Sequence, residues 1–261
     1  MSKKQERARA RRRFEKRQAM LERRADINDR TTRLVAIIGT VVLVCGLLAL
    51  LGAKFAHVAP QPVLTAAGCP QPPAMLGTAA KLTLPDKASA LGKTFTADIA
   101  TNCGTITVTL FGDKAPQAVA SFIQLARADY WLNSPCHRLT TSPTLKVLQC
   151  GDPTGTGQGG PGYGFAVENA PQDGTYPRGT LAMARTTDPK TGNGGQFFIV
   201  YGDSTLPDKN GYTVFGTVTS GLDTVDKIAK AGVAAGGGST TDGAPAAPIS
   251  ILRVAVTEKK A

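Results

Sequence analysis

Few side chains in this 261-residue sequence belong to the types that build metal centres or nucleophilic sites. The only histidines are His57 and His137, and the five cysteines form no C-x-x-C pair. A metal site usually needs three or four nitrogen, thiolate or carboxylate ligands at characteristic spacings. The G-x-S-x-G turn that carries a serine nucleophile is also absent from the sequence. We therefore expect no metal and no cofactor, and the sequence shows no recognisable machinery for a hydrolase.

One glycine-rich segment matches a ligand-binding motif. Residues 155–160, GTGQGG, fit the pattern G-x-G-x-x-G of dinucleotide-binding folds. That site requires a helix to begin at the motif, so that backbone amides and the helix dipole meet the pyrophosphate. Here Pro161, Gly162 and Gly164 follow, and this composition does not begin a regular helix. We interpret the segment as a structural loop.

Five short motifs occur in a fixed order in the second half of the chain. They are His137-Arg138, Gln149-Cys150-Gly151-Asp152, Leu181-Ala182-Met183-Ala184, Gly194-Gly195-Gln196-Phe197-Phe198-Ile199 and Val214-Phe215-Gly216. In this order they resemble the motifs of cyclophilin-type peptidyl-prolyl cis-trans isomerases, over about residues 94–257. The resemblance implies a mainly β fold, a closed eight-stranded antiparallel barrel capped by two helices. It also implies that proline-containing polypeptides are the substrates.

Isomerisation of an X-Pro bond requires neither a nucleophile nor a metal, which agrees with the side chains present. Amide resonance gives the bond a barrier of about 18–20 kcal/mol, and an enzyme lowers it by binding the twisted amide better than the planar one. A pyramidal proline nitrogen gains a lone pair that a guanidinium can meet. The resemblance implies that Arg138 supplies this guanidinium and that Gln149 and Gln196 orient it and the peptide backbone.

The resemblance also implies a pocket for the proline ring. Phe198 and Leu206 match the walls of this pocket, and Ala184 matches a backbone contact to the substrate. Core packing is the alternative role for the two apolar side chains.

Three positions depart from the residues that are common in the family. Lys146 falls where an aromatic pocket residue is usual, so Leu145 or Val147 would have to fill that space. Tyr212 stands where His is common, and a ring with a polar tip could replace it. Arg185 stands where Asn is common. We count Val147, Tyr212 and Arg185 among the candidate binding residues.

A second function remains open at the level of sequence. Three extra residues, near 141–144, separate Arg138 from Gln149 when compared with the commonest spacing in the family. Together with Lys146, this insertion favours a non-catalytic, membrane-tethered binder or chaperone scaffold for proline-containing peptides. Arg138 with both glutamines favours the isomerase.

Hydrophobic periodicity places the motifs on a β-rich scaffold. Apolar residues alternate over 95–99 and 106–110, which is typical of a β-hairpin. Helical spacing follows Pro116 and recurs over 222–229. A last strand is expected over 249–256. Periodicity alone indicates a barrel or sandwich with packed helices.

Four cysteines lie outside the most apolar segment: Cys69, Cys103, Cys136 and Cys150. An even number in an oxidising compartment suggests two disulfides with three possible connectivities. The pair Cys136–Cys150 would flank the expected hairpin that carries Arg138, leaving Cys69 to pair with Cys103. Four free buried thiols are the alternative.

An uncharged run of 20 residues, 34–53, is long enough to cross the roughly 30 Å core of a bilayer. We interpret it as an uncleaved signal-anchor helix. A cleaved signal peptide and a buried core helix are the alternatives. The excess of Lys and Arg before the run predicts a cytoplasmic N-terminus and an extracytoplasmic catalytic domain in a single-pass protein of the cell membrane.

The charge is concentrated at the N-terminus. Residues 1–33 contain 13 Lys and Arg and 5 Asp and Glu, a net charge of +8, which leaves +3 for the other 228 residues. A nucleic-acid-binding body should carry the basic charge itself, so we expect no nucleic-acid partner. The basic tail is expected to contact anionic lipid; an RNA or a cytoplasmic protein is the alternative partner.

The domain organisation follows from these segments. Residues 1–33 form a basic cytoplasmic tail, 34–53 the membrane helix, 54–93 a proline-rich extracytoplasmic stalk and 94–258 the isomerase domain. Proline-rich segments are extended and semi-rigid, so the stalk is expected to hold the domain away from the membrane.

Overall fold

The computed structural model describes residues 3–54 and 63–260. The chain divides into two units, 1–61 and 62–261, which are described separately. The expected stalk residues 55–62, including His57, lie outside the described residues.

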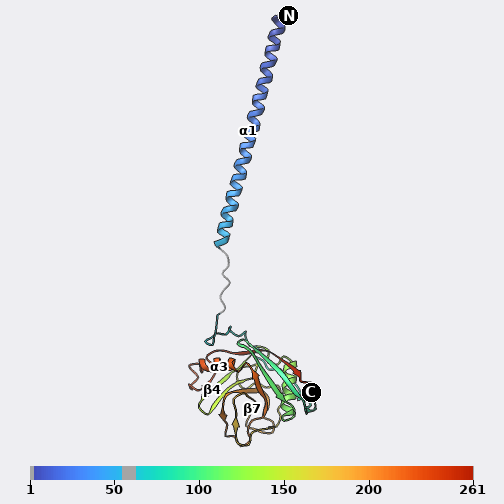
Figure 1. The fold of residues 1–261 in the computed structure, drawn as a ribbon, viewed down its shortest axis with the longest axis vertical. Helices are drawn as coiled ribbons and strands as arrows, with labels where there is room; N and C mark the ends of the chain where they lie inside the picture. Colours follow the sequence, from blue (N-terminus) through green and yellow to red (C-terminus); the bar gives the residue numbers. More distant parts are fainter. Residues whose placement is uncertain (1–2, 55–62, 261) are drawn as a thin grey trace. The chain divides into compact units, whose positions relative to one another are not determined.

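The first unit contains one long helix, α1 (Lys3–Lys54), which includes the apolar run predicted to span a membrane (Figure 1). The stretch Glu15–Leu47 is long and apolar enough to cross a bilayer, with a mean hydropathy of 1.6 in its most apolar window. Its large apolar side chains, from Leu34 to Leu47, are exposed. A signal sequence near the N-terminus can meet the same criteria of helix length and hydropathy.

The second unit is built on a curled antiparallel sheet with two α-helices packed against it, and it also contains one short 3₁₀ helix (Figure 1). Its helices are η1 (Lys87–Ser89), α2 (Pro116–Arg127) and α3 (Leu222–Ala231). Its strands are β1 (Thr94–Thr101), β2 (Gly104–Phe111), β3 (Ser134–Pro135), β4 (Arg138–Ser142), β5 (Leu145–Cys150), β6 (Thr175–Tyr176), β7 (Thr180–Arg185), β8 (Asn193–Gly202), β9 (Ser204–Thr205), β10 (Val214–Ser220), β11 (Asp242–Gly243) and β12 (Ser250–Glu258).

The expected eight strands are present, together with two short edge strands. The sheet has ten strands in the order β11-β4-β5-β8-β7-β10-β2-β1-β12-β3, and β3 and β11 at its two ends have two residues each. The chain passes from β3, which pairs with β12, into β4 after only two residues. The two ends of the sheet are therefore brought together through β3, within the described residues, and not by a direct β4–β12 ladder.

The alternating apolar residues of the first hairpin face one core. Phe95 lies opposite Leu110 and Ile99 opposite Ile106 in the β1–β2 register, and all four side chains are buried. Because side chains alternate between the two faces of a strand, one face of this hairpin is apolar throughout. The expected β-hairpin and the expected helix after Pro116 are confirmed.

Helix α2 contributes the aromatic centre of this core. Phe122 packs against Trp131, Phe197 and Phe215, with ring centroids 4.7, 5.7 and 5.6 Å away. Trp131 is the only tryptophan of the sequence, is 2% exposed and donates its indole N–H to Gly195 O at 3.1 Å. The sheet that carries the candidate site is therefore backed by a rigid core.

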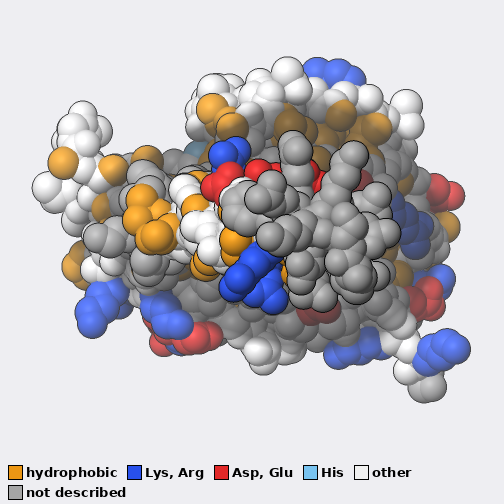
Figure 2. All heavy atoms as spheres, turned by 90° about the horizontal axis from the view of Figure 1, so that it is seen from above, with side chains coloured by type: hydrophobic (Ala, Val, Ile, Leu, Met, Phe, Trp, Pro, Cys, Tyr) orange, Lys and Arg blue, Asp and Glu red, His pale blue; other side chains and the backbone are white. Residues whose placement is uncertain are grey.

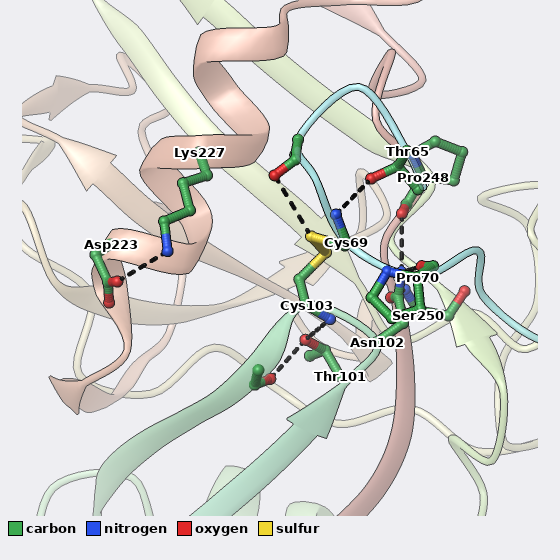
Figure 3. The surroundings of a disulfide bond; sticks show 12 residues. Thr65, Cys69, Pro70, Thr101, Asn102, Cys103, Asp223, Lys227, Pro248 and Ser250 are labelled. Carbon is green, nitrogen blue, oxygen red and sulfur yellow. Dashed lines mark hydrogen bonds and ion pairs between the residues drawn. A yellow bond between two sulfur atoms is a disulfide. The ribbon is translucent and has the colours of Figure 1, made fainter. Parts of the chain in front are cut away.

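Residues 63–86, which we call the strap, lie against this unit and do not extend away from it. Cys69 forms a disulfide with Cys103 in the β1–β2 turn, and Asn102 donates through Nδ2 to Pro70 O at 2.8 Å (Figure 3). Asn102 also accepts a hydrogen bond from Ser250 N through Oδ1, which ties the strap to β12. The structure thus differs here from the stalk expected over 54–93.

Side-chain amides of α2 hold the second half of the strap. Gln124 donates to Thr83 O at 2.8 Å and Gln117 donates to Pro85 O at 2.9 Å. Leu82 donates its backbone N–H to Pro161 O at 2.7 Å. Proline has no backbone N–H, so a proline-rich segment has fewer donors for its own carbonyl groups. The carbonyls of Thr83 and Pro85 instead accept hydrogen bonds from the side chains of α2.

Charged side chains of both signs share the molecular surface. On the face seen in Figure 2, Lys and Arg side chains lie among Asp and Glu side chains.

Candidate functional site

A pocket of about 150 Å³ opens where β4, β5, β7 and β8 meet the loop over 206–212. It is lined by Arg138, Leu145, Val147, Gln149, Ala184, Arg185, Phe198, Leu206 and Tyr212. Eight of these nine residues are candidate site residues from the sequence, and Leu145 is the alternative named for the position of Lys146. The ninth candidate, Gln196, lies in an adjoining groove.

Strand alternation selects which β5 side chains face the pocket. Leu145, Val147 and Gln149 are two residues apart and share one face, whereas Lys146 lies between them and packs against Gly202. Lys146 is therefore not among the lining residues, and both apolar alternatives fill the space.

Three side chains form a hydrogen-bonded relay along one edge of the pocket. Arg138 Nη1 donates to Gln149 Oε1 at 3.2 Å, and Gln149 Nε2 donates to Gln196 Oε1 at 3.0 Å. Gln196 Nε2 in turn donates to the carbonyls of Gly157 and Gly159, both at 3.0 Å. Arg138 and Gln149 lie directly opposite each other in the β4–β5 register. The relay therefore fixes which way each amide points.

Asp242 completes this edge, and no sequence motif marks it. Its carboxylate accepts from Arg138 Nε through Oδ1 and from Arg138 Nη2 through Oδ2, both at 2.8 Å. The hydrogen bond from Arg138 lowers the pKa of Asp242, so the carboxylate is ionised at neutral pH. The two residues are 104 positions apart, in a segment rich in Gly, Ser and Thr.

Aromatic rings form the apolar side of the pocket. Phe198 meets Tyr212 and Tyr176 edge to face, with centroids 5.7 and 6.3 Å apart. The hydroxyl of Tyr176 accepts from Tyr212 N at 2.8 Å, which satisfies a buried polar group. Val147 packs in the same small cluster. Tyr176 is absent from the sequence candidates because it follows no family motif used there.

Arg185 is a buried cation that holds the pocket's loop. Its side chain is 3% exposed and pairs with Asp208 at 2.6 Å. Its Nε donates to Gly211 O at 2.8 Å, and its guanidinium lies 4.9 Å from the ring centre of Tyr212. Arg185 therefore anchors the loop that carries Leu206 and Tyr212 to strand β7.

The segment 155–160 is a loop, and no helix begins in it. It borders the groove of about 470 Å³ that contains Gln196. Asp152, buried beneath it, accepts from Thr154 and from Gly159 N at 3.0 Å. Burial acts to raise the pKa of Asp152, but these hydrogen bonds outweigh it and lower the pKa. A Cβ on Gly159 would lie 1.9 Å from Asp152 Oδ1, so a larger residue there would displace this hydrogen-bonded carboxylate.

Both expected disulfides are present in the structure. Cys136–Cys150 joins the residue two before Arg138 to the residue after Gln149, and Cys69–Cys103 closes the strap. Cys45 on α1 is free and exposed. Among residues 3–54 and 63–260, no group of three His, Cys, Asp or Glu side chains has metal-binding geometry.

Comparison with known proteins relates this geometry to a family. The sequence model of the "Cyclophilin type peptidyl-prolyl cis-trans isomerase/CLD" family matches residues 96–256. The chain is 52% identical over 166 residues to the "Probable peptidyl-prolyl cis-trans isomerase B" of Mycobacterium tuberculosis H37Rv, covering 59% of this chain and 52% of that protein. The Mycobacterium leprae protein of the same name is 47% identical over 201 residues, covering 70% and 64%. The chain therefore spans about half to two thirds of the length of these relatives.

Solved structures show the same likeness. A Cryptosporidium parvum cyclophilin type peptidyl-prolyl cis-trans isomerase matches with 31% identity and a TM-score of 0.52, over 64% of this chain and 99% of that chain. The same protein solved in the presence of the dipeptide Ala-Pro matches with 32% identity and a TM-score of 0.51, over 63% and 99%. The fold, the ordered motifs and the family match agree, and the chain belongs to the cyclophilin-type peptidyl-prolyl cis-trans isomerase family.

Proposed function

We propose that this protein catalyses cis-trans isomerisation of X-Pro bonds in polypeptides and so assists their folding. The observation that carries the proposal is the position of Arg138, held by three hydrogen bonds at the edge of an apolar pocket walled by Phe198. A relative crystallised with Ala-Pro shares the fold. A proline ring fits the chemistry of an aromatic pocket, and a guanidinium fits the chemistry of the twisted amide beside it.

The proposed mechanism is electrostatic. Twisting the amide removes resonance and leaves a lone pair on the proline nitrogen. A guanidinium has five N–H donors, of which three are taken by Asp242 and Gln149, so two remain for the substrate. Because these donors strengthen their contact as the nitrogen becomes pyramidal, they stabilise the transition state more than the planar ground state.

Gln149 and Gln196 have supporting roles in this proposal. Gln149 holds Arg138 Nη1 and is itself held by Gln196. Phe198, Leu206, Val147 and Tyr212 surround the proline ring, and Ala184 offers its backbone to the peptide. No covalent bond forms or breaks, so the reaction uses no cofactor.

The direct test compares the full-length chain in detergent micelles with its Arg138→Ala variant. Exchange of an X-Pro peptide between cis and trans is followed by proton exchange spectroscopy. We expect kcat to fall by about 10²–10³-fold, the loss typical of a transition-state hydrogen-bond donor. Arg178→Ala is the matched control, because Arg178 is 43% exposed and pairs with Asp226 as Arg138, at 41%, pairs with Asp242.

One result would refute the isomerase, and another would refute only the proposed role of Arg138. If the unmodified chain shifts peptide signals on titration without accelerating exchange, the chain is the non-catalytic binder. If Arg138→Ala and Arg178→Ala retain equal activity, the reaction does not use the proposed guanidinium. The position of Lys146 outside the pocket removes one of the two sequence features that favoured the binder.

We further propose that the chain is anchored in the cell membrane by residues 34–53, with the tail 1–33 in the cytoplasm and the isomerase domain 94–258 outside. Three features support this: the apolar stretch of α1, the basic tail that would contact anionic lipid, and two disulfides, which persist in oxidising compartments. Its substrates would then be extracytoplasmic polypeptides.

Protease added outside intact membrane vesicles or spheroplasts tests this orientation. We expect the domain to be digested and a fragment containing the tail to be protected. Protection of the domain would overturn the orientation. The mass of the mature chain separates an anchor from a cleaved signal, because cleavage would remove the entire basic tail.

A further inference from the structure

Asp242 makes the strongest set of contacts to the proposed catalytic guanidinium. It occupies one complete edge of Arg138, the Nε and Nη2 donors, at 2.8 Å each, whereas Gln149 makes a single bond of 3.2 Å to Nη1. Resting on the proposed isomerase function, we propose that Asp242 is a positioning residue, which fixes the Arg138 guanidinium in the orientation that meets the twisted amide.

The fold holds the carboxylate in place through the backbone. Asp242 is the first residue of β11 and pairs with Thr140 of β4, the strand that carries Arg138. Thr141 N donates to Thr241 O at 2.8 Å, immediately beside this pair. Ser239 Oγ accepts from the backbone N–H of Thr241 and of Asp242 at 3.2 and 3.1 Å. The two ends of the ion pair therefore sit on hydrogen-bonded neighbouring strands.

This anchoring matters because Arg138 needs an external constraint. Its side chain is 41% exposed and has several rotatable bonds, so ordering it costs conformational entropy. A bidentate carboxylate fixes both the plane and the direction of a guanidinium, which one amide oxygen does not. Because Asp242 and Arg138 are preorganised before the substrate binds, the remaining donors need not be oriented during the reaction.

The structure offers a matched ion pair away from the pocket. Arg178 donates from Nη1 and Nη2 to Asp226 of α3 at 2.8 and 2.7 Å, and the side chains are 43% and 44% exposed. Asp242 is 46% exposed, so the two pairs match in exposure and in having two charge-assisted hydrogen bonds, although Asp242 bonds Nε and Nη2 and Asp226 bonds Nη1 and Nη2. Asp226 does not line the pocket. Removing each carboxylate in turn separates a role in the site from the general effect of losing a surface ion pair.

The kinetic test uses Asp242→Ala, Asp242→Asn and Asp226→Ala in the full-length chain in detergent micelles. For Asp242→Ala we expect kcat on an X-Pro peptide to fall at least about tenfold with KM within about twofold, since a displacement of about 1 Å at a catalytic group can cost about 10²-fold. Asp242→Asn keeps one acceptor oxygen and should fall between Asp242→Ala and the unmodified chain. Asp226→Ala should retain the unmodified kcat.

A double variant shows whether Asp242 acts through Arg138. In the Arg138→Ala background, adding Asp242→Ala should change kcat by less than about twofold, because no guanidinium remains to be positioned. A further large loss in this background would overturn the proposal, since Asp242 would then act on the substrate or on the fold. Unchanged or increased kcat in the single Asp242→Ala variant would overturn it as well.

A spectroscopic measurement tests the positioning without activity. In protein with 15N-labelled arginine, the Nε–H of Arg138, assigned by its loss in Arg138→Ala, should exchange slowly with water and become fast in Asp242→Ala. Fast exchange in the unmodified chain would overturn the positioning role. Absence of isomerisation by the unmodified chain would instead refute the proposed function, and slow Nε–H exchange would still show that Asp242 fixes the guanidinium.

Discussion

Removal of the Cys69–Cys103 disulfide is expected to lower the stability of the second unit more than removal of Cys136–Cys150. The two bonds join residues separated by 34 and 14 positions. A crosslink reduces the entropy of the unfolded chain by an amount that grows with the logarithm of the loop length. At 25 °C this relation gives about 3.8 kcal/mol for the longer loop and about 3.0 kcal/mol for the shorter one.

The same substitutions should rank in the opposite order for activity. Cys136–Cys150 flanks the two strands that carry Arg138 and Gln149, so its removal should loosen the relay and lower kcat. The strap remains bonded to the barrel through Leu82 and through the side-chain amides of α2 when its disulfide is absent. Removing Cys69–Cys103 should therefore leave kcat within about twofold of the unmodified value, since its contacts lie outside the pocket.

The assay replaces each cysteine pair by alanine in the full-length chain and follows guanidinium unfolding by the fluorescence of Trp131. This side chain is 2% exposed and packs 4.7 Å from Phe122, so its emission reports the core of the second unit. The reasoning is refuted if the Cys69→Ala, Cys103→Ala variant loses less than about 1 kcal/mol, well below the usual range for native disulfides. It is also refuted if that variant loses most of its kcat while still folded.

Other changes should separate the parts of the pocket. Phe198→Ala should raise KM more than it lowers kcat and cost about 3–5 kcal/mol of stability, as measured by kinetics and denaturation; an unchanged KM would contradict the wall assignment. Arg185→Asn should lower the free energy of unfolding by about 1–3 kcal/mol and should raise KM. The loss stays in this range because the remaining Asp208 carboxylate is 34% exposed and can be hydrated. Full stability would contradict the anchoring role. The hydrogen bond from Arg138 lowers the pKa of Asp242 from its usual value of 3.8. The contribution of the Arg138–Asp242 ion pair to kcat should therefore be lost only as pH falls below that value. A kcat profile that declines with a midpoint at pH 5 or 6 would contradict this assignment.

The sequence predicts the pocket well because the residues that line it follow local rules. Val147 and Gln149 share a face because strand side chains alternate, and Lys146 must then point away. Leu145 and Val147, the two residues proposed for the space of the missing aromatic residue, both line the pocket. The register between strands brings residues of different strands together, since Gln149 of β5 lies opposite both Arg138 of β4 and Phe198 of β8.

Contacts between strand residues and distant loops could not be predicted from strand alternation or register. Asp242 reaches Arg138 from a segment without hydrophobic periodicity, and nothing in the sequence fixes the length or path of that segment. Arg185 is identified at its position, but its burial depends on Asp208 and on the carbonyl of Gly211, which belong to another loop. A charged residue is expected at the surface unless its partners are known. Here Asp208 and Gly211 lie more than 20 positions from Arg185 in the sequence, so they cannot be recognised as its partners from sequence alone.

The strap shows why composition alone misjudges a linker. Proline and small residues predict an extended backbone, and the strap has little regular secondary structure. The backbone carbonyl groups of an extended segment are free to accept hydrogen bonds. Such a segment lies on the domain where the domain offers donors to these carbonyls, and projects into solvent where it does not. Asn102, Gln117 and Gln124 provide such donors at three points, and Cys103 provides a covalent one. These residues belong to the β1–β2 turn and to α2, not to the strap. The path of the strap therefore depends on residues outside it, and its own composition does not predict that path.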